Sequence, residues 1–170
     1  VLAGKIGDVQ FVRVSSRDPK VPHAGFVQSS GGLFLDMMIH DLDMIRYLSG
    51  SEVVEVFARG AVLIDPAIGE AGDVDTATVS ATMANGALAL IDNSRQAVYG
   101  YDQRAEVFGS KGCVQNGNDL PSTMVLSTED GIVSEKPLWF FLERYMDSYR
   151  AEIRAVVNSI LNDTETEVGI

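Results

Sequence analysis

Runs of β-branched residues and short turn sequences predict that much of this chain is β-sheet. Residues 8–15 are rich in Val and Phe, which predicts a strand near the start. β-Branched residues are frequent from residue 53 to about 134, and we predict long strands at Val53–Ile64 and Val74–Ala84.

Two dipeptides predict tight hairpins within this region. Asn85-Gly86 separates Val74–Met83 from Ala87–Ser94, and Asp130-Gly131 lies between two short apolar runs, Thr123–Ser127 and Ile132–Ser134. Asn-Gly and Asp-Gly favour two-residue turns because both central positions need a positive φ. Such turns join antiparallel neighbours, so the sheet is predicted to be mainly antiparallel.

Two longer apolar segments have helical character. Leu33–Leu48 follows Gly31-Gly32 and ends at Ser49-Gly50, and its Leu, Met and Ile content favours a helix. A second helix is predicted from about Phe140 to Leu161, with apolar residues at helical spacing. The fold class is therefore predicted as α+β, an open, mainly antiparallel sheet with helices on one face.

One face of the strand Val74–Ala84 carries only small uncharged side chains. Side chains alternate along a strand, so one face collects Thr76, Thr78, Ser80 and Thr82. A solvated sheet face more often carries Lys and Glu. We therefore expect another subunit or domain to cover this face.

Composition narrows the classes of partner. The 170 residues are 46% hydrophobic and 22% charged, as in a globular domain, and 13 basic against 24 acidic residues give a net charge of −11. This charge argues against nucleic acid or an anionic membrane as a partner. The single Cys113 cannot form an internal disulfide; we expect a packed thiol in a cytoplasmic protein. No apolar stretch reaches the ~20 residues that cross a bilayer.

The helix Leu33–Leu48 holds the candidate chemistry. At about 100° per residue, one narrow stripe collects Asp36, His40, Asp43 and Tyr47, while most other positions are apolar. A helix that is apolar nearly all round is buried, so these polar groups are predicted to be buried or to line a cavity. Burying a carboxylate costs free energy, so we expect a carboxylate at such a position to have a function.

Three interpretations of this stripe remain open. His40 is suited to general acid–base chemistry near neutral pH, with Asp36 positioning a substrate hydroxyl or orienting the imidazole. Alternatively, Asp36, His40 and Asp43 bind a metal, although no Cys or second His lies at supporting spacing. In a purely structural role, Asp36 caps a helix and His40 is a core residue. The acid–base interpretation is favoured.

The segment Gly-Gly-Leu-Phe-Leu-Asp-Met-Met-Ile-His-Asp-Leu-Asp at residues 31–43 resembles the substrate-domain signature of the glucose–fructose oxidoreductase/inositol dehydrogenase (Gfo/Idh/MocA) family. Further segments resemble its inositol 2-dehydrogenase members in particular, at residues 16–19, 93–102, 106–112 and 141–145. The resemblance extends over nearly the whole chain.

This resemblance implies a two-domain enzyme in which a Rossmann domain, absent here, binds NAD or NADP. Residues 1–170 are then the C-terminal domain for substrate binding and oligomerisation, as part of a longer protein. Asp36 and His40 match the family's catalytic Asp and His, and the His takes a polyol or sugar hydroxyl proton as hydride leaves. The family's catalytic Lys belongs to the other domain.

The chain is expected to hold no cofactor-binding or metal-binding residues of its own. No Gly-x-Gly-x-x-Gly lies between a strand and a helix, and Gly109–Gly112 is predicted as a turn between strands. Glu135-Lys136-Pro137 resembles the family's catalytic Lys triplet, but it follows the sheet, so Lys136 is predicted to be solvated. The isolated chain is expected to be inactive.

Weaker candidates for substrate binding lie in the loops around these elements: Arg17, His23, Arg95 and Tyr101. The oligomer is predicted to be a homodimer or homotetramer formed through the sheet. The alternatives are a metal-dependent hydrolase or isomerase that uses Asp36, His40 and Asp43, or a non-catalytic domain for sugar sensing or oligomerisation.

Overall fold

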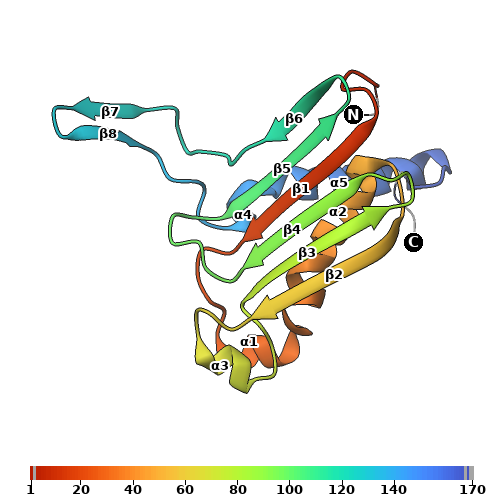
Figure 1. The fold of residues 1–170 in the computed structure, drawn as a ribbon. Helices are drawn as coiled ribbons and strands as arrows, with labels where there is room; N and C mark the ends of the chain where they lie inside the picture. The colour runs from red at the N-terminus through yellow and green to blue at the C-terminus, as the bar shows by residue number, and fades with distance from the viewer. Residues whose placement is uncertain (2, 167, 169–170) are drawn as a thin grey trace.

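An open six-stranded sheet forms the centre of the molecule (Figure 1). The structure, a computed structural model, describes residues 1, 3–166 and 168. The strand order is β2-β3-β4-β1-β5-β6, and the strands span β1 Val9–Arg17, β2 Val53–Ala61, β3 Thr76–Met83, β4 Leu88–Ser94, β5 Asp102–Gly109 and β6 Gly112–Asn116. Every pair of neighbours is antiparallel except β1 and β4, which are parallel.

The hairpin predicted at Asn85-Gly86 joins β3 to β4. Gly86 has a φ of 87°, and the Asn85 side chain accepts a hydrogen bond from the backbone N–H of Ala87. The positive φ explains why this turn takes glycine at no steric cost. The turn thereby fixes the antiparallel register of Thr82 against Leu88.

Helical segments lie on one face of the sheet and at one end of it (Figure 1). Their bounds are α1 Ala24–Ser29, a π-helix η1 Phe34–Met38, α2 Ile39–Ser49, α3 Pro66–Glu70, α4 Phe141–Arg144 and α5 Met146–Asn162. Helix α2 packs against β1 and β4, whereas no helix of the described residues lies on the opposite face of the sheet (Figure 1). The predicted α+β architecture is confirmed. The last predicted helix is instead two, because Tyr145 leaves the helical conformation at φ −106° and ψ 12°.

The hydrophobic core lies between the sheet and the continuous helix η1–α2. From the sheet, the inward positions of β1, β3 and β4 alternate as predicted, with Val12 and Ile91 fully buried. From the helix, the core receives Leu33, Met38 and Ile45, all at 0% exposure. Because β1 and β4 are central in the sheet, the helix is held directly over the parallel pair.

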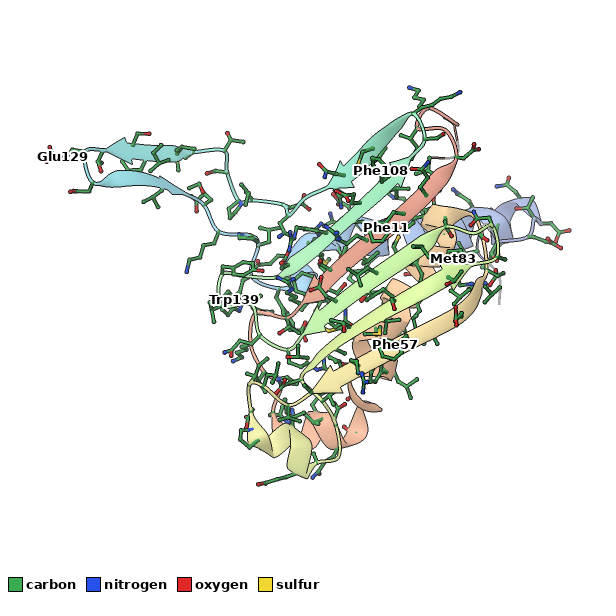
Figure 2. All side chains as sticks on the ribbon, viewed as in Figure 1. Phe11, Phe57, Met83, Phe108, Glu129 and Trp139 are labelled. Carbon is green, nitrogen blue, oxygen red and sulfur yellow. The ribbon has the colours of Figure 1, made fainter. Side chains whose placement is uncertain are left out.

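The other face of the sheet is exposed, and the small-residue stripe predicted on β3 lies there. Thr78 and Ser80 are exposed, whereas Ala77, Val79 and Ala81 point to the core. Apolar side chains from neighbouring strands share this open face, among them Phe57 at 59% and Phe108 at 48% exposure (Figure 2).

A second, two-stranded sheet projects away from the body of the domain (Figure 1). It consists of β7 Val125–Thr128 and β8 Gly131–Ser134, joined by a turn next to the predicted Asp130-Gly131 pair, with Glu129 at its tip (Figure 2). Every residue of both strands is exposed.

The exposure of Cys113 and the length of the helices each test one prediction. Cys113 is exposed on the edge strand β6, so the prediction of a packed thiol is wrong. None of the described helices is long and apolar enough to cross a bilayer.

Candidate active site

The helix that carries Asp36 and His40 begins at two consecutive glycines with left-handed backbone. Gly31 and Gly32 have φ values of 89° and 81°. The Asp73 carboxylate accepts the backbone N–H of Leu33 with both oxygens, at 3.0 and 3.1 Å. A β-carbon on residue 32 would lie 2.8 Å from Asp73 Oδ1, so this cap requires glycine. The start of the helix is therefore fixed from the loop that precedes β3.

The first part of this helix is a π-helix, and Asp36 lies at its centre. A π-turn closes over five residues instead of four, so the even 100° spacing of an α-helix does not hold across Phe34–Met38. Such bulges are common at functional sites. The exact stripe predicted from regular α-helical geometry is therefore wrong in its first turn.

The helix is buried on one side only. Its inward residues are Met37, Met38, Asp41 and Ile45, whereas His40 is exposed and Leu35 and Tyr47 are each 66% exposed. The prediction of a helix buried all round is wrong for this chain. His40 therefore lies on the side of the helix that faces away from the sheet.

Asp36 is held by a buried arginine. Nη1 of Arg95 lies 2.7 Å from Oδ2 of Asp36 and 3.3 Å from Oδ2 of Asp18. Arg95 is only 2% exposed, whereas the side chain of Asp36 is 25% exposed. Burial raises the pKa of Asp18, and the charge of Arg95 opposes that rise. Arg95 was predicted to contact substrate, but its side chain lies behind Asp36.

The parallel pair of strands explains how these groups meet. Asp18 follows the last residue of β1 and Arg95 follows the last residue of β4, and the two strands end side by side with Arg17 opposite Ser94. The backbone N–H of Asp18 donates to the Ser94 carbonyl at 3.0 Å. The carboxyl ends of parallel strands meet at one edge of a sheet, which is a common location for sites.

Asp41 anchors the helix from its buried side. It is 4% exposed and accepts hydrogen bonds from Ser16 Oγ and, at 2.7 Å, from Asn93 Nδ2. Burial raises the pKa of Asp41, and the two hydrogen bonds oppose that rise. Ser16 and Asn93 lie on β1 and β4, so this contact fixes the orientation of α2 and leaves His40 on its free side.

Asp41 was not predicted from the sequence. The available signal was a polar residue, Asn93, at an inward position of a predicted strand, since a buried polar side chain needs a hydrogen-bond partner. Ser16, the other partner of Asp41, lies one residue beyond the strand predicted at residues 8–15.

Tyr101 belongs to an aromatic cluster with the C-terminal segment. Its ring centroid lies 6.1 Å from that of Tyr145 and 6.4 Å from that of Phe140, both edge-on. Burial raises the pKa of Tyr101, and the nearby charges of Asp18 and Asp41 add to the rise. The cluster joins the chain before β5 to the start of α4, which lies on the same side of the sheet as α2 (Figure 1).

Arg17 points to the opposite face of the sheet. Its guanidinium binds Asp92 at 2.7 Å, Tyr99 at 3.2 Å and Asp102 at 3.5 Å. Arg17 follows Ser16 in β1, and Ser16 points to Asp41, so alternation places the two side chains on opposite faces. The structure therefore does not bring Arg17 to Asp36. It does not support a contact between Arg17 and a substrate that is bound at Asp36.

His23 caps a short helix. Its Nδ1 accepts the backbone N–H of Phe26 at 3.1 Å at the start of α1, and its side chain is exposed. No hydrogen bond of the described residues links His23 to Asp36 or His40.

Asp36 and His40 lie on an open surface. A cavity of about 370 Å³ next to the helix start is lined by Gly31, Gly32 and Phe34 together with residues of the loop before β3, and a second of about 270 Å³ lies at Arg17 and Asp92. Neither cavity includes Asp36 or His40.

The metal interpretation finds no support in the described part of the chain. No three His, Cys, Asp or Glu residues there are gathered closely enough to hold a metal ion, and Asp43 faces Arg46 at 3.4 Å.

Two segments whose sequences resemble cofactor-binding or catalytic motifs lie elsewhere in the structure. Gly109–Gly112 is the hairpin turn between β5 and β6, and Lys136 is exposed in the segment after β8. Neither forms a strand–loop–helix unit that could bind a dinucleotide phosphate.

The chain belongs to the GFO/IDH/MocA family, because the family profile of the GFO/IDH/MocA C-terminal domain matches residues 1–115. It is 54% identical over 157 residues to a Thermotoga maritima protein named myo-inositol 2-dehydrogenase, covering 92% of this chain and 47% of that protein. It is also 47% identical over 162 residues to a Rhizobium meliloti inositol 2-dehydrogenase, covering 95% of this chain and 49% of the relative.

A solved structure described as a probable dehydrogenase from Thermotoga maritima superposes with a TM-score of 0.95 at 50% identity, over 99% of this chain and 50% of that one. A scyllo-inositol dehydrogenase from Lactobacillus casei, solved with NAD(H) and scyllo-inositol, gives a TM-score of 0.87 at 33% identity, over 98% and 50%. The chain spans about half the length of the curated relatives it matches.

Proposed function

We propose that this chain is the substrate-binding half of an NAD-linked dehydrogenase that oxidises a ring hydroxyl of inositol or a similar polyol to a ketone. The observation that carries the proposal is the helix η1–α2, which presents Asp36 and His40 on its accessible side while its other side is fixed to the sheet. Similarity to proteins named inositol 2-dehydrogenase supports the substrate class.

The roles of the two residues follow from their chemistry. Oδ2 of Asp36 is held by Arg95, and Oδ1 makes no hydrogen bond to the described residues, so it can accept one from a substrate hydroxyl. His40 is the group that takes the hydroxyl proton, as general base, while the hydride leaves the same carbon. Tyr101 is a weaker candidate for contact with the polyol ring, as is His23.

NAD is assigned to the part of the protein outside this chain. The described residues do not form a strand, a glycine-rich loop and a helix in succession: Gly31-Gly32 follows α1, and Gly109–Gly112 connects two strands, so they do not fit a dinucleotide. When bound beside the substrate carbon, the nicotinamide accepts the hydride. The chain's own contribution is to orient the polyol and accept the proton, and we expect no turnover from residues 1–170 alone.

The accessible side of the helix is proposed to face this cofactor domain. Around Asp36 and His40 the helix exposes large apolar side chains, Phe34, Leu35, Ile39 and Tyr47, between 38% and 66% exposed. Such a patch on a soluble protein marks an interaction surface. A domain that covers this patch would enclose Asp36 and His40 in a closed site.

The open face of the sheet is proposed to form a homodimer or homotetramer interface. Its uncharged stripe on β3 and the exposed Phe57 and Phe108 suit burial against a second copy better than solvation. A cytoplasmic location stays part of the proposal.

The function is tested with the full-length protein, NAD and myo-inositol, by following NADH absorbance. The variant His40→Ala should lower kcat by about 10²–10⁴-fold, the usual contribution of a general base. Asp130→Asn, in the turn between β7 and β8, is the control and should keep full activity, since this hairpin projects away from the body of the domain (Figure 1). Wild-type protein that reduces no NAD with any inositol isomer would contradict the proposal.

A further inference from the structure

Arg95 is a large charged side chain buried at the edge of the site. It is 2% exposed, and its only hydrogen-bond partners among the described residues are the carboxylates of Asp18 and Asp36. A buried guanidinium needs such compensation, because removing it from water is costly. The two carboxylates and one guanidinium form a group with a net charge of −1, which we call the Arg95 clasp.

Both contacts of the Arg95 clasp are made by the same nitrogen atom of the guanidinium. Nη1 makes both contacts, while Nε and Nη2, also buried, make no hydrogen bond to the described residues. A guanidinium can donate five N–H groups, and the side-chain contacts of Arg95 all go to these two carboxylates. The contact to Asp36 is the shorter one, at 2.7 Å, in the range of a strong charge-assisted hydrogen bond.

The contact determines the orientation of Asp36. Arg95 is held by its backbone, whose N–H donates to the Asp75 carbonyl at 2.8 Å directly after β4. Asp36, by contrast, lies in a π-turn and its side chain is 25% exposed. The clasp therefore ties Asp36 to the end of β4 through Oδ2 and leaves Oδ1 without a hydrogen bond to the described residues.

We propose that Arg95 is a positioning residue, which orients Asp36 towards the substrate hydroxyl and does not itself contact substrate. The inference rests on the proposed function above. It replaces the direct substrate contact predicted for Arg95, because almost none of the side chain is accessible from the surface that carries His40.

A purely structural role predicts a different pattern of effects. If Arg95 only stabilised the fold, its removal would lower stability and would reduce activity independently of Asp36. If it acts through Asp36, the two residues must be energetically coupled in turnover, and removing Arg95 should cost little once Asp36 cannot function.

The test is a double-mutant cycle in the full-length enzyme with Arg95→Met, Asp36→Asn and the combined variant, measuring kcat and KM for myo-inositol and KM for NAD. Misplacement of a catalytic group by about 1 Å can cost about 10²-fold. We therefore expect Arg95→Met to lower kcat by about 10–100-fold with an unchanged KM for NAD. The combined variant should be no slower than Asp36→Asn alone.

Two further variants keep the test decisive. Arg95→Lys keeps the positive charge but lacks the planar fork, and it should fold and retain a kcat between wild type and Arg95→Met. Should Arg95→Met fail to fold, the same cycle is run with Arg95→Lys. Arg150→Met is the control for loss of an arginine, because Arg150 is exposed on α5 and, among the described residues, pairs only with Asp147; it should leave kcat unchanged.

The outcomes separate the two proposals. Additive losses in an active enzyme, or a combined variant much slower than Asp36→Asn, would overturn the role of Arg95 and leave the dehydrogenase intact. Wild-type protein without polyol turnover would overturn both.

Discussion

Single buried carboxylates hold the loops at the ends of the strands. Asp75 is 0% exposed and accepts three backbone N–H groups, from Leu63, Ile64 and Asp65. Burial opposes its ionisation, but these hydrogen bonds prevail and lower its pKa. Ionised Asp75 therefore stabilises the loop that leads from β2 to α3.

Asp102 has the corresponding role on the open face. It is 1% exposed and accepts hydrogen bonds from Arg104, Tyr99 and Asn118. Burial alone would raise its pKa, but these partners, led by Arg104, lower it. The cluster ties β5 to the chain before and after it.

We predict that Asp102→Ala destabilises the domain by about 3 kcal/mol, near the lower end of the cost of breaking a buried ion pair. The lower end applies because Arg17 and Arg104 are partly exposed, so water can solvate them once the carboxylate is gone. Urea unfolding at pH 7 measures the difference in the free energy of unfolding. A loss within about 0.5 kcal/mol, which is typical of surface changes, would contradict this account.

The same residue predicts a pH dependence. The pKa of Asp102 is lower in the folded state, so the folded protein binds fewer protons at this site than the unfolded chain. Its stabilisation is therefore complete above the unfolded pKa and is lost as pH falls through the folded pKa. Unfolding measured between pH 7 and pH 3 should show a difference between wild type and Asp102→Ala that shrinks towards acid pH.

At the scale of elements, the helix η1–α2 is positioned by contacts at three places. Asp73 caps its start, Arg95 holds its π-turn, and Asp41 joins its first α-turn to β1 and β4. None of these contacts comes from a neighbouring residue in the sequence. The helix thus derives its orientation from the sheet, and the sheet's parallel pair determines where Asp36 and His40 lie.

We predict that Gly32→Ala destabilises the protein and lowers polyol oxidation. A left-handed backbone costs a non-glycine residue about 1–2 kcal/mol, and the new β-carbon would also displace the Asp73 carboxylate. Thermal unfolding and kcat of the full-length protein measure the two effects. Gly117→Ala is the control, because a β-carbon there meets nothing within 4 Å; equal losses in both variants would contradict the cap.

At the scale of the whole molecule, much apolar surface remains exposed on the described part of the chain. The exposed residues lie on the open sheet face, on the accessible side of η1–α2, along α5 and on the β7–β8 hairpin (Figure 2). A two-stranded hairpin is marginally stable alone in water. The domain therefore has the surface of a component that functions within a larger assembly.

The proposed oligomer predicts the effect of a charge on the open face. Ser80 lies in the middle of β3, between Phe57 of β2 and Leu90 of β4. Ser80→Arg should leave the fold intact, as surface changes do, but should place an unpaired charge in the interface and shift the full-length protein to a smaller species. Light scattering after size-exclusion chromatography measures the mass. The control is Ser148→Arg, exposed on α5; equal masses for wild type and both variants would contradict a sheet interface.

The local sequence predicted most of the helices and strands and two of the turns that connect them. Asn85-Gly86 and Asp130-Gly131 predicted two hairpins correctly, because glycine takes the positive φ that each turn region needs, 87° at Gly86 and 148° at Gly131. The second turn itself lies at Glu129-Asp130, one residue before the predicted pair. The face of Thr78 and Ser80 followed from alternation alone. The resemblance at residues 31–43 predicted the family, which the match of the family profile confirms.

Only the tertiary structure decided which groups meet. The parallel pairing of β1 with β4 brings Asp18 next to Arg95, and the packing of η1–α2 on one face of the sheet leaves Arg17 on the face away from Asp36. The π-turn and the one-sided burial of the helix also arise from its contacts with Asp73, Arg95 and the sheet. Periodicity reports which residues share a side of an element, whereas pairing between distant strands depends on the free energy of the whole packed core.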